Sequence, residues 1–414
     1  MLTTIVAAFA LLAFAHAWRF GFTYLDDNDI ILTKASFLAH PASACDSFTH
    51  RYFLNDTNVY YRPFVNLSFV LDAHLAGAEP WVYHFTNSAL HAGACALMFT
   101  LLRQLAIGRM WAALSACLFA VHPMQVASVV WVPGRNDLLL GIFSLGALVL
   151  LERRAKNRVT IVGHWLCFVS ALLCKETAVC LPIVFAVLAF GRHSKFTKAQ
   201  KFALGAAWGT TLLGYFVLHR QVVTLPRGTM GKAIDAARAH PEALVSELGK
   251  VFVPARLQVV ATIKDAHIGP GIAAIGAIVV LLVALRRAVR VRVILMAGGL
   301  LMLPLLMVLL ASDFVMLENR LYLPVAGASV FVAECMRSFG QTQPRFWRLG
   351  AVAVAGIVLV FGVTSFRYSA YFRDRYAFSD AAIKAAPSSY LAIWLQAQRS
   401  FHGANGPPKA SSAH

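Results

Sequence analysis

Apolar residues along the chain gather into eleven runs that are separated by short polar segments. A helix needs on the order of 20 mainly apolar residues to cross a bilayer, and these runs meet or approach that length. The pattern therefore predicts an all-α polytopic membrane protein with about eleven transmembrane helices. The predicted spans cover residues 2–22, 82–102, 110–121, 138–151, 160–173, 177–190, 202–218, 271–285, 293–311, 321–333 and 349–364.

Some apolar stretches are not expected to cross the membrane. Residues 64–78 are interrupted by Asp72 and His74, which is more typical of an interfacial or re-entrant helix. We expect amphipathic helices in the first and the fourth outer loops. Residues 1–17 end in Ala-His-Ala, as a cleavable signal peptide would, but they lack a basic N-terminal region, so we expect a retained helix.

Lys and Arg residues collect in alternate loops, and cytoplasmic loops are the ones that retain them. The loop that follows the first run is instead rich in Asp. This asymmetry predicts a cytoplasmic N-terminus, an outer first loop and an outer C-terminal segment. The five basic loops contain Arg103 and Arg109; Arg153, Arg154, Lys156 and Arg158; Arg192, Lys195, Lys198 and Lys201; Arg286, Arg287, Arg290 and Arg292; and Arg337, Arg345 and Arg348.

The composition agrees with a chain that is solvated mainly by lipid. Of its 414 residues, 59% are hydrophobic and only 14% are charged, which is unusual for a soluble domain. The formal net charge of +18 would suggest nucleic acid in a soluble protein. Here the basic residues sit in short clusters between apolar runs, so we expect a lipid bilayer and no nucleic acid as partner.

An acidic string, residues 24–30, begins just beyond the first run. Its carboxylates at Asp26 and Asp27 would emerge at the membrane surface, where the head group of a lipid-linked substrate lies. A carboxylate there could act as a general base or bind a divalent cation. The alternative is that an acidic turn keeps the loop outside and caps the helix that follows.

Other polar side chains are predicted on the same outer face. Arg62 is flanked by aromatic residues and suits a phosphate or a sugar, although it could equally anchor an aromatic belt. His84, Asn87 and His91 lie on one helical face, where hydrogen bonds between helices compete with substrate or metal binding.

Three further polar groups flank outer turns. His122 and Arg135 bracket one turn, and Pro133 and Gly134 should break the helix so that Arg135 points into an outer cavity. Lys175 and Glu176 could neutralise each other. Glu318, Asn319 and Arg320 precede the tenth run.

With these strings in view, the sequence resembles the membrane module of the transmembrane and tetratricopeptide-repeat O-mannosyltransferases, within the GT-C class of glycosyltransferases. The strings occur in the family's order over nearly the whole chain. They are Leu25-Asp26-Asp27, Tyr61-Arg62-Pro63, Leu67-Ser68-Phe69, Leu71-Asp72, Tyr83-His84 with Asn87 and His91, Phe119-Ala120-Val121-His122-Pro123, Gly134-Arg135-Asn136-Asp137-Leu138-Leu139, Cys174-Lys175-Glu176 and Glu318-Asn319-Arg320-Leu321-Tyr322-Leu323-Pro324.

The resemblance implies a GT-C fold, a sugar donor carried on polyprenyl phosphate, and one-step transfer with inversion to a protein, glycan or lipid acceptor. It implies Asp26 as the catalytic base, with Asp27 as the close alternative. Basic residues would hold the donor phosphate, with Arg62 and Glu318 beside them at the substrate. These basic residues are Arg135, Lys175 and Arg320. A divalent cation is compatible with this scheme, and the sequence leaves the need for one open.

The sequence departs from the family in two places. A few positions after His122 the family usually has an acidic residue, whereas this chain has Ala127 in that stretch. The family also continues into many helical repeats. Here we predict a transmembrane module over 1–366, a helical stub over 367–400 and a disordered tail over 401–414. A catalytically degenerate relative that binds polyprenyl lipid or a partner is the competing hypothesis.

The single module and short tail favour a bacterial inner-membrane enzyme whose active face is periplasmic. The endoplasmic reticulum membrane, with a lumenal active face, is the alternative.

Overall fold

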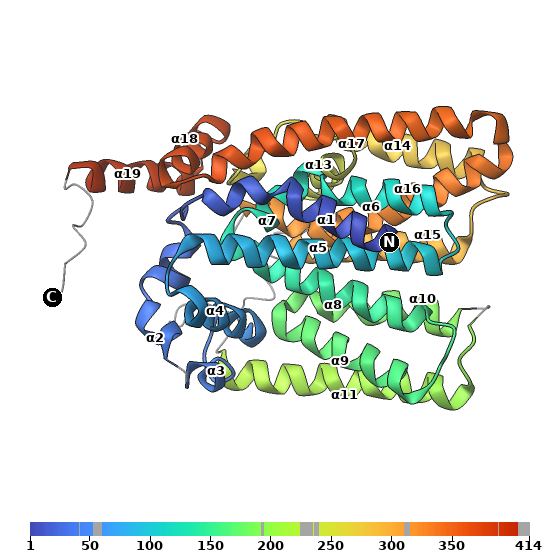
Figure 1. The fold of residues 1–414 in the computed structure, drawn as a ribbon, viewed down its shortest axis with the longest axis horizontal. Coiled ribbons are helices and arrows are strands. Elements are labelled where there is room, and N and C mark those ends of the chain that lie inside the picture. Colours follow the sequence, from blue (N-terminus) through green and yellow to red (C-terminus); the bar gives the residue numbers. More distant parts are fainter. Residues whose placement is uncertain are drawn as a thin grey trace.

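The long helices of the protein run side by side as a bundle, as the computed structural model shows (Figure 1). The structure describes residues 1–40, 42–52, 60–191, 194–223, 235, 240–309, 315–387 and 389–404. Short helices gather at one end of the bundle, where α2, α3 and α4, which belong to the first predicted loop, lie together (Figure 1). We call this the loop end.

The first half of the chain alternates long helices with short ones. In order, its elements are α1 (Leu2–Ala13), η1 (Ala15–Arg19), η2 (Asn28–Leu32), α2 (Ala35–Ala39), α3 (Ser43–Asp46), α4 (Pro63–Ala76), α5 (Pro80–Gln104), α6 (Arg109–Ala120), η3 (Pro123–Gln125), α7 (Val126–Val129), η4 (Val132–Gly134), α8 (Arg135–Glu152), α9 (Arg158–Cys174), η5 (Glu176–Cys180), α10 (Leu181–Phe190) and α11 (Lys198–Val222).

The second half adds further helices and one short strand pair. Its elements are α13 (Pro241–Phe252), β1 (Ala261–Thr262), η6 (Ile263–Asp265), α14 (Ile268–Ala284), α15 (Val291–Leu309), β2 (Val315–Met316), η7 (Glu318–Leu321), α16 (Tyr322–Thr342), η8 (Pro344–Phe346), α17 (Trp347–Ser369), η9 (Ala370–Phe372), α18 (Arg375–Ala385) and α19 (Tyr390–Ala404). The strands pair antiparallel, with Ala261 opposite Met316, and so bring the segments before α14 and α16 together.

Local sequence signals explain where several helices begin. Proline occupies the first turn of α4, α5 and α13, where a missing backbone N–H costs no helical hydrogen bond. Asn157 caps α9 by accepting from the Thr160 amide at 2.9 Å. Thr197 and Gln200 form a reciprocal capping box at the start of α11.

Each of the eleven predicted runs contains a helix. Among the described residues, four helices are long and apolar enough to span a membrane, and a fifth span results if the pair 109–120 and 123–129, bent by 51°, is counted as one. Five shorter apolar helices accompany them. The chain is thus an all-α protein with several membrane-type helices, and the number of crossings stays a prediction. The first run differs from the prediction, since its α-helix ends at Ala13 and continues as η1.

Helices α11 and α17 lie at opposite sides of the bundle (Figure 1). Only 17% and 11% of their most apolar windows are buried inside the protein. Exposed apolar helices of this length require a non-aqueous solvent, so these faces fit contact with lipid.

Small residues let backbones approach inside the bundle. A Cβ atom at Gly327 of α16 would lie 2.5 Å from the backbone nitrogen of Leu301 in α15. Gly249 and Gly271 make a similar contact between α13 and α14, where the corresponding distance is 2.6 Å. These contacts hold α16 close to α15 and α13 close to α14.

The C-terminal helices pack on the loop end. The Gly21 amide, ahead of the acidic string, donates to the Arg373 carbonyl at 2.8 Å. Asp374 caps α18 by accepting two backbone amides. The predicted stub is therefore helical, but it consists of two helices separated near Pro387. Residues 405–414 of the predicted disordered tail lie outside the described residues.

Candidate functional site

The predicted site residues come from elements that meet at the loop end. Asp26 and Asp27 follow η1, and Arg62 precedes the first residue of α4. Of the remaining members, Arg135 begins α8 and Lys175 precedes η5, while Glu318 and Arg320 belong to η7.

The turn ahead of the acidic pair holds Asp27 in place. Tyr24, just before it, has a φ of 62°, a left-handed conformation that is unusual for a tyrosine. The Asp27 carboxylate accepts from the Thr23 amide at 2.5 Å and from the Thr23 hydroxyl at 2.7 Å. Trp131 donates to the same hydroxyl at 3.1 Å. Asp27 is buried, whereas Asp26 is only partly buried and remains accessible.

The surroundings of Asp26 suit a proton acceptor near neutral pH. Burial raises the pKa of its carboxyl to about 7, and the charges of Asp27 and Asp29 act in the same direction. The positive charges of Arg62 and Arg320 oppose this shift. For Asp27, burial raises the pKa to about 6 against the hydrogen bonds from Thr23. General bases work best when their pKa lies near the working pH.

Arg62 is fixed by a carboxylate and by aromatic rings. Its Nε and Nη2 atoms donate to the two oxygens of Glu176 at 3.1 and 2.7 Å. Its guanidinium carbon lies 4.3 Å from the ring centroid of Tyr60 and 5.1 Å from that of Tyr52. This fork geometry orients the guanidinium more firmly than a single contact would. Burial opposes the positive charge, but Glu176 more than compensates, so the pKa of Arg62 lies above its ordinary value.

The sequence suggested that Lys175 and its neighbour Glu176 could neutralise each other, but Lys175 pairs with other residues. Its Nζ atom contacts Asp137 at 2.6 Å and Asn136 at 3.3 Å. The second carboxylate oxygen of Asp137 accepts from Asn319 at 2.8 Å. A chain of polar contacts therefore joins η5, α8 and η7, which are far apart in the sequence.

Glu318 is buried at the start of η7. Its oxygens accept from the Gln258 amide at 2.9 Å and from the Tyr368 hydroxyl at 2.6 Å. Lys250 of α13 lies 3.7 Å from it. Burial raises the pKa of Glu318 against these contacts. The contacts fix η7, and with it Arg320, whose charge acts on Asp26.

Arg135 does not point into an outer cavity, contrary to the expectation from Pro133 and Gly134. It is fully buried. Its guanidinium contacts Asp72 at 2.6 Å and donates to Asn87 at 2.7 Å and to the Tyr83 carbonyl at 3.0 Å. These partners lie on α4 and α5. Arg135 therefore joins three helices, a geometry that favours a structural role over contact with a donor phosphate.

The polar residues of α5 also have protein partners. His91 contacts the Tyr322 hydroxyl and the Ala120 carbonyl, both at 2.9 Å. His84 contacts the Gly21 carbonyl at 3.2 Å, and His122 contacts the Val251 carbonyl at 2.9 Å. Asn87 accepts from Arg135. These contacts match the helix-to-helix alternative. Within the described residues, no three His, Cys, Asp or Glu side chains cluster as metal ligands.

Ala127, the departure from the family pattern, is buried in α7. The helix packs directly on the start of α8, since a Cβ atom at Gly134 would lie 2.5 Å from the Ala127 carbonyl oxygen. Nearby, the amide side chain of Gln125 is fully buried, and its two polar atoms have no hydrogen bond within the described part of the chain. A polar group is therefore still present close to this position.

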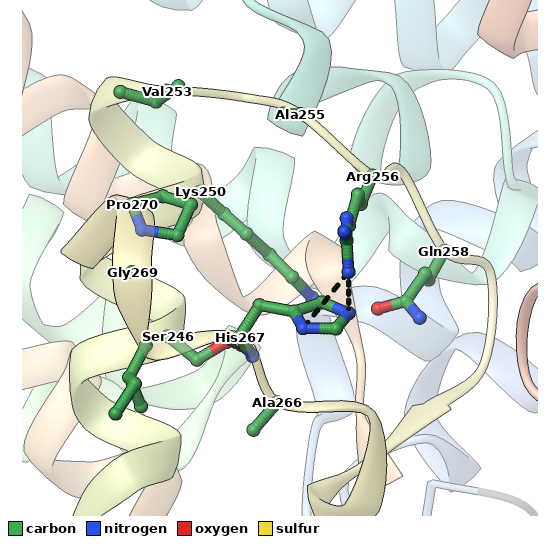
Figure 2. Close-up of a pocket in the computed structure, with 11 residues that line it drawn as sticks. Ser246, Lys250, Val253, Ala255, Arg256, Gln258, Ala266, His267, Gly269 and Pro270 are labelled. Carbon is green, nitrogen blue, oxygen red and sulfur yellow. Dashed lines mark hydrogen bonds between the residues drawn. The ribbon is translucent and has the colours of Figure 1, made fainter.

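The sequence reasoning missed a cavity beside Glu318. It measures about 430 Å³ and lies between α13 and the start of α14. Figure 2 shows Lys250 and Gln258 lining it, with Arg256 directed at the ring of His267. Both Lys250 and Gln258 also contact Glu318. The only sequence signal for it was Glu247 three residues before Lys250, a helical ion-pair spacing.

Three curated relatives are similar to parts of this chain, although no protein-family model matches it. Protein O-mannosyl-transferase TMTC2 of Mus musculus is 28% identical over 176 residues, which cover 37% of this chain and 21% of that protein. Protein O-mannosyl-transferase Tmtc1 of Drosophila melanogaster is 36% identical over 121 residues, or 29% of this chain and 14% of that protein. Protein O-mannosyl-transferase TMTC4 of Homo sapiens is 28% identical over 226 residues, or 48% and 30%.

A solved structure is similar over nearly the whole fold. ArnT from Cupriavidus metallidurans, bound to undecaprenyl phosphate, superposes with a TM-score of 0.51 at 15% identity and covers 96% of this chain and 79% of that one. The three sequence matches confirm the resemblance to the TMTC O-mannosyltransferases over part of the chain, and the superposition on ArnT shows a similar fold. The chain matches less than a third of the length of the curated relatives above.

Proposed function

We propose that this chain, a TMTC-like membrane module with a GT-C fold, is an inverting glycosyltransferase. It takes a sugar, mannose by similarity, from a polyprenyl-phosphate donor and transfers it to a hydroxyl group of a protein, glycan or lipid acceptor. The observation that carries this proposal is the accessible carboxylate of Asp26, whose pKa is about 7 and which lies within the field of Arg62 and Arg320.

We assign a role to each of these groups. Asp26 accepts the proton of the acceptor hydroxyl as its oxygen attacks the anomeric carbon. The bond from that carbon to the donor phosphate breaks, and the polyprenyl phosphate leaves with the electron pair. Arg320 and Arg62 stabilise the negative charge that grows on this phosphate. Attack and departure on opposite faces invert the anomeric centre.

The other predicted site residues support this centre to different degrees. Lys175 and Glu318 hold η5 and η7 through Asp137, Gln258 and Tyr368. We therefore assign them to positioning. Arg135 is assigned to the same role. Substrate or metal binding by His84, Asn87, His91 and His122 remains a prediction, as does a divalent cation.

We place the reaction on the outer face of the membrane, with the N-terminus cytoplasmic and the C-terminal helices outside. A bacterial inner membrane remains our proposal, while the eukaryotic origin of the TMTC relatives supports the alternative of the endoplasmic reticulum. The boundaries at residues 366 and 400 are likewise proposals.

A degenerate protein that binds polyprenyl lipid or a partner is the second candidate, because buried Ala127 stands where the family has an acidic residue. A flippase is a third. The test compares Asp26→Asn and Asp27→Asn in proteoliposomes that are supplied with dolichyl- or undecaprenyl-phosphate mannose and a peptide acceptor. Asp46→Asn, in the same loop, is the control.

We expect Asp26→Asn to lower sugar transfer by about 100-fold or more, since that is the usual contribution of a general base. Donor binding should persist, and Asp46→Asn should transfer normally. If wild-type protein binds donor but makes no glycosidic product, the protein is a catalytically degenerate relative that binds polyprenyl lipid. Movement of donor across the bilayer without product would identify a flippase. Unchanged transfer by folded Asp26→Asn and Asp27→Asn proteins would reject the catalytic assignment.

A further inference from the structure

A second cavity lies at the end of the bundle opposite the loop end, where α16 ends and α17 begins (Figure 1). It measures about 500 Å³ and is lined in part by Trp111, Arg290, Arg337, Gly340, Gln341 and Trp347. None of these residues belongs to the proposed glycosyl-transfer site.

The two arginines of this cavity share one buried carboxylate. Arg290 and Arg337 both bind Glu334, at 2.5 and 2.6 Å, and Glu334 is fully buried. Two guanidinium groups against one carboxylate leave one net positive charge, by the sum +2 − 1 = +1. Because Glu334 is covered by its partners, the cavity wall presents the cations.

The polar groups on the wall are donors that retain bonding capacity. A guanidinium has five N–H groups. Among the described residues, the side chain of Arg290 donates through Nε to Glu334, through Nη1 to the Leu105 carbonyl and through Nη2 to Glu334, which leaves N–H groups on both terminal nitrogens. The side-chain oxygen of Gln341 is occupied by Arg337, so its amide nitrogen is the group left to donate.

An indole adds a further donor. Trp111 lies across Gly340, because a Cβ atom on that glycine would be 3.6 Å from the indole Nε1 atom. Within the described chain this N–H has no protein acceptor, and both residues line the cavity. A site that offers positive charge and N–H donors is complementary to an anion with several oxygens.

The cavity also adjoins an exposed apolar face. Trp347 begins α17, and Leu349 and Val352 on the same helix are 68% and 69% exposed. Only 11% of the apolar window of this helix is buried. An amphiphile with its head group in the cavity could lay an acyl chain on this apolar surface.

We propose that this cavity binds a phosphate group, and that the phosphate is the head group of an anionic phospholipid in the leaflet opposite the reaction. Arg286 and Arg287 precede the lining residue Arg290, and Arg345 and Arg348 flank Trp347, so they add positive charge at the same end of the bundle and favour such a lipid over a zwitterionic one.

The test measures thermal unfolding of the detergent-purified full chain against increasing phosphatidylglycerol, phosphatidylcholine, glycerol 3-phosphate or inorganic phosphate. Gly340→Leu places a side chain in the cavity. Gly356→Leu is its matched control, because a Cβ atom there meets nothing within 4 Å. Trp111→Phe removes the indole donor and serves if Gly340→Leu does not fold.

For the wild type we expect a saturable rise in the melting temperature with phosphatidylglycerol and none with phosphatidylcholine. Trp111→Phe should weaken the apparent affinity about tenfold, the usual loss for one charge-assisted hydrogen bond, and Gly340→Leu should weaken it at least as much because its side chain occupies the cavity. Gly356→Leu should respond as the wild type does. Equal responses to both lipids, or wild-type affinity in Gly340→Leu and Trp111→Phe, would overturn the proposal. A saturable response to the soluble phosphates at the affinity of the lipid would keep the anion site and reject the lipid as its source.

Discussion

Arg62 and Glu176 face each other with two parallel hydrogen bonds, of 3.1 and 2.7 Å, although 114 residues separate them in the chain. The pair joins the start of α4 to η5. The neighbour of Glu176, Lys175, turns to Asp137 instead. The adjacent residues Lys175 and Glu176 thus hold different parts of the candidate site. The position of Arg62 near Asp26 depends on Glu176.

Replacing Glu176 with Gln should release Arg62. The buried guanidinium would lose its counter-charge, and because the Glu176 side chain is 37% exposed we expect a moderate loss of about 1–3 kcal/mol in unfolding free energy. Thermal unfolding in detergent measures this. Glu79→Gln, an exposed glutamate just ahead of α5, should melt as the wild type does. A melting temperature equal to that of the wild type in both variants would show that the Arg62–Glu176 pair does not stabilise the fold.

Sugar transfer should depend on the protonation of Asp26. A general base acts in its deprotonated form, so with a pKa of about 7 the rate should rise with pH. Between pH 6 and pH 8 we expect an increase of about tenfold. The negative charge of Asp29 raises the pKa of Asp26, so Asp29→Asn should move the acidic limb to lower pH. The pH dependence of transfer, measured with saturating donor, checks both statements. If the acidic limb of the pH–rate profile does not move in Asp29→Asn, the group that titrates is not Asp26.

Arg135 should prove structural. Arg135→Gln leaves the buried carboxylate of Asp72 without its ion pair, and such a loss costs about 3–5 kcal/mol. We therefore expect a large drop in folded yield and melting temperature, with an unchanged KM for donor in the folded fraction. Arg367→Gln, at an exposed position of α17, is the control. A raised KM with normal stability would instead return Arg135 to the donor phosphate.

The contact between α15 and α16 should not tolerate a side chain at Gly327. A Cβ atom there would lie 2.5 Å from the Leu301 nitrogen and 2.7 Å from the Ala297 carbonyl oxygen, so the helices must separate. We expect Gly327→Ala to lower the unfolding free energy by about 1–3 kcal/mol, as overpacking commonly does. Gly356→Ala, in open space on α17, should be neutral or slightly stabilising. Denaturant or thermal unfolding of both variants measures this. Equal stability of Gly327→Ala and Gly356→Ala would contradict the prediction.

The helices themselves could be predicted from the sequence, because an apolar run near the length of a bilayer satisfies its backbone in only a few ways. The prediction was less accurate where the chain bends just beyond a run or where a helix ends inside one. Residues 109–129 bend by 51° between two helices, and the first α-helix ends at Ala13 rather than continuing. The sequence also placed Asp26, Arg62 and Arg320 on one face, since their loops alternate with basic ones.

The sequence by itself determined which residues are helical and which polar strings gather at the loop end, because periodicity and hydropathy are local properties. Only the tertiary structure decided the partners. Lys175 pairs with Asp137 and not with Glu176, and Arg135 turns inward to Asp72. Lys250 of α13 and Gln258, which follows this helix, reach Glu318 from a segment that the motifs did not mark. Side-chain pairing depends on which helix ends meet and at what angle, and that is set by packing across residues far apart in the chain.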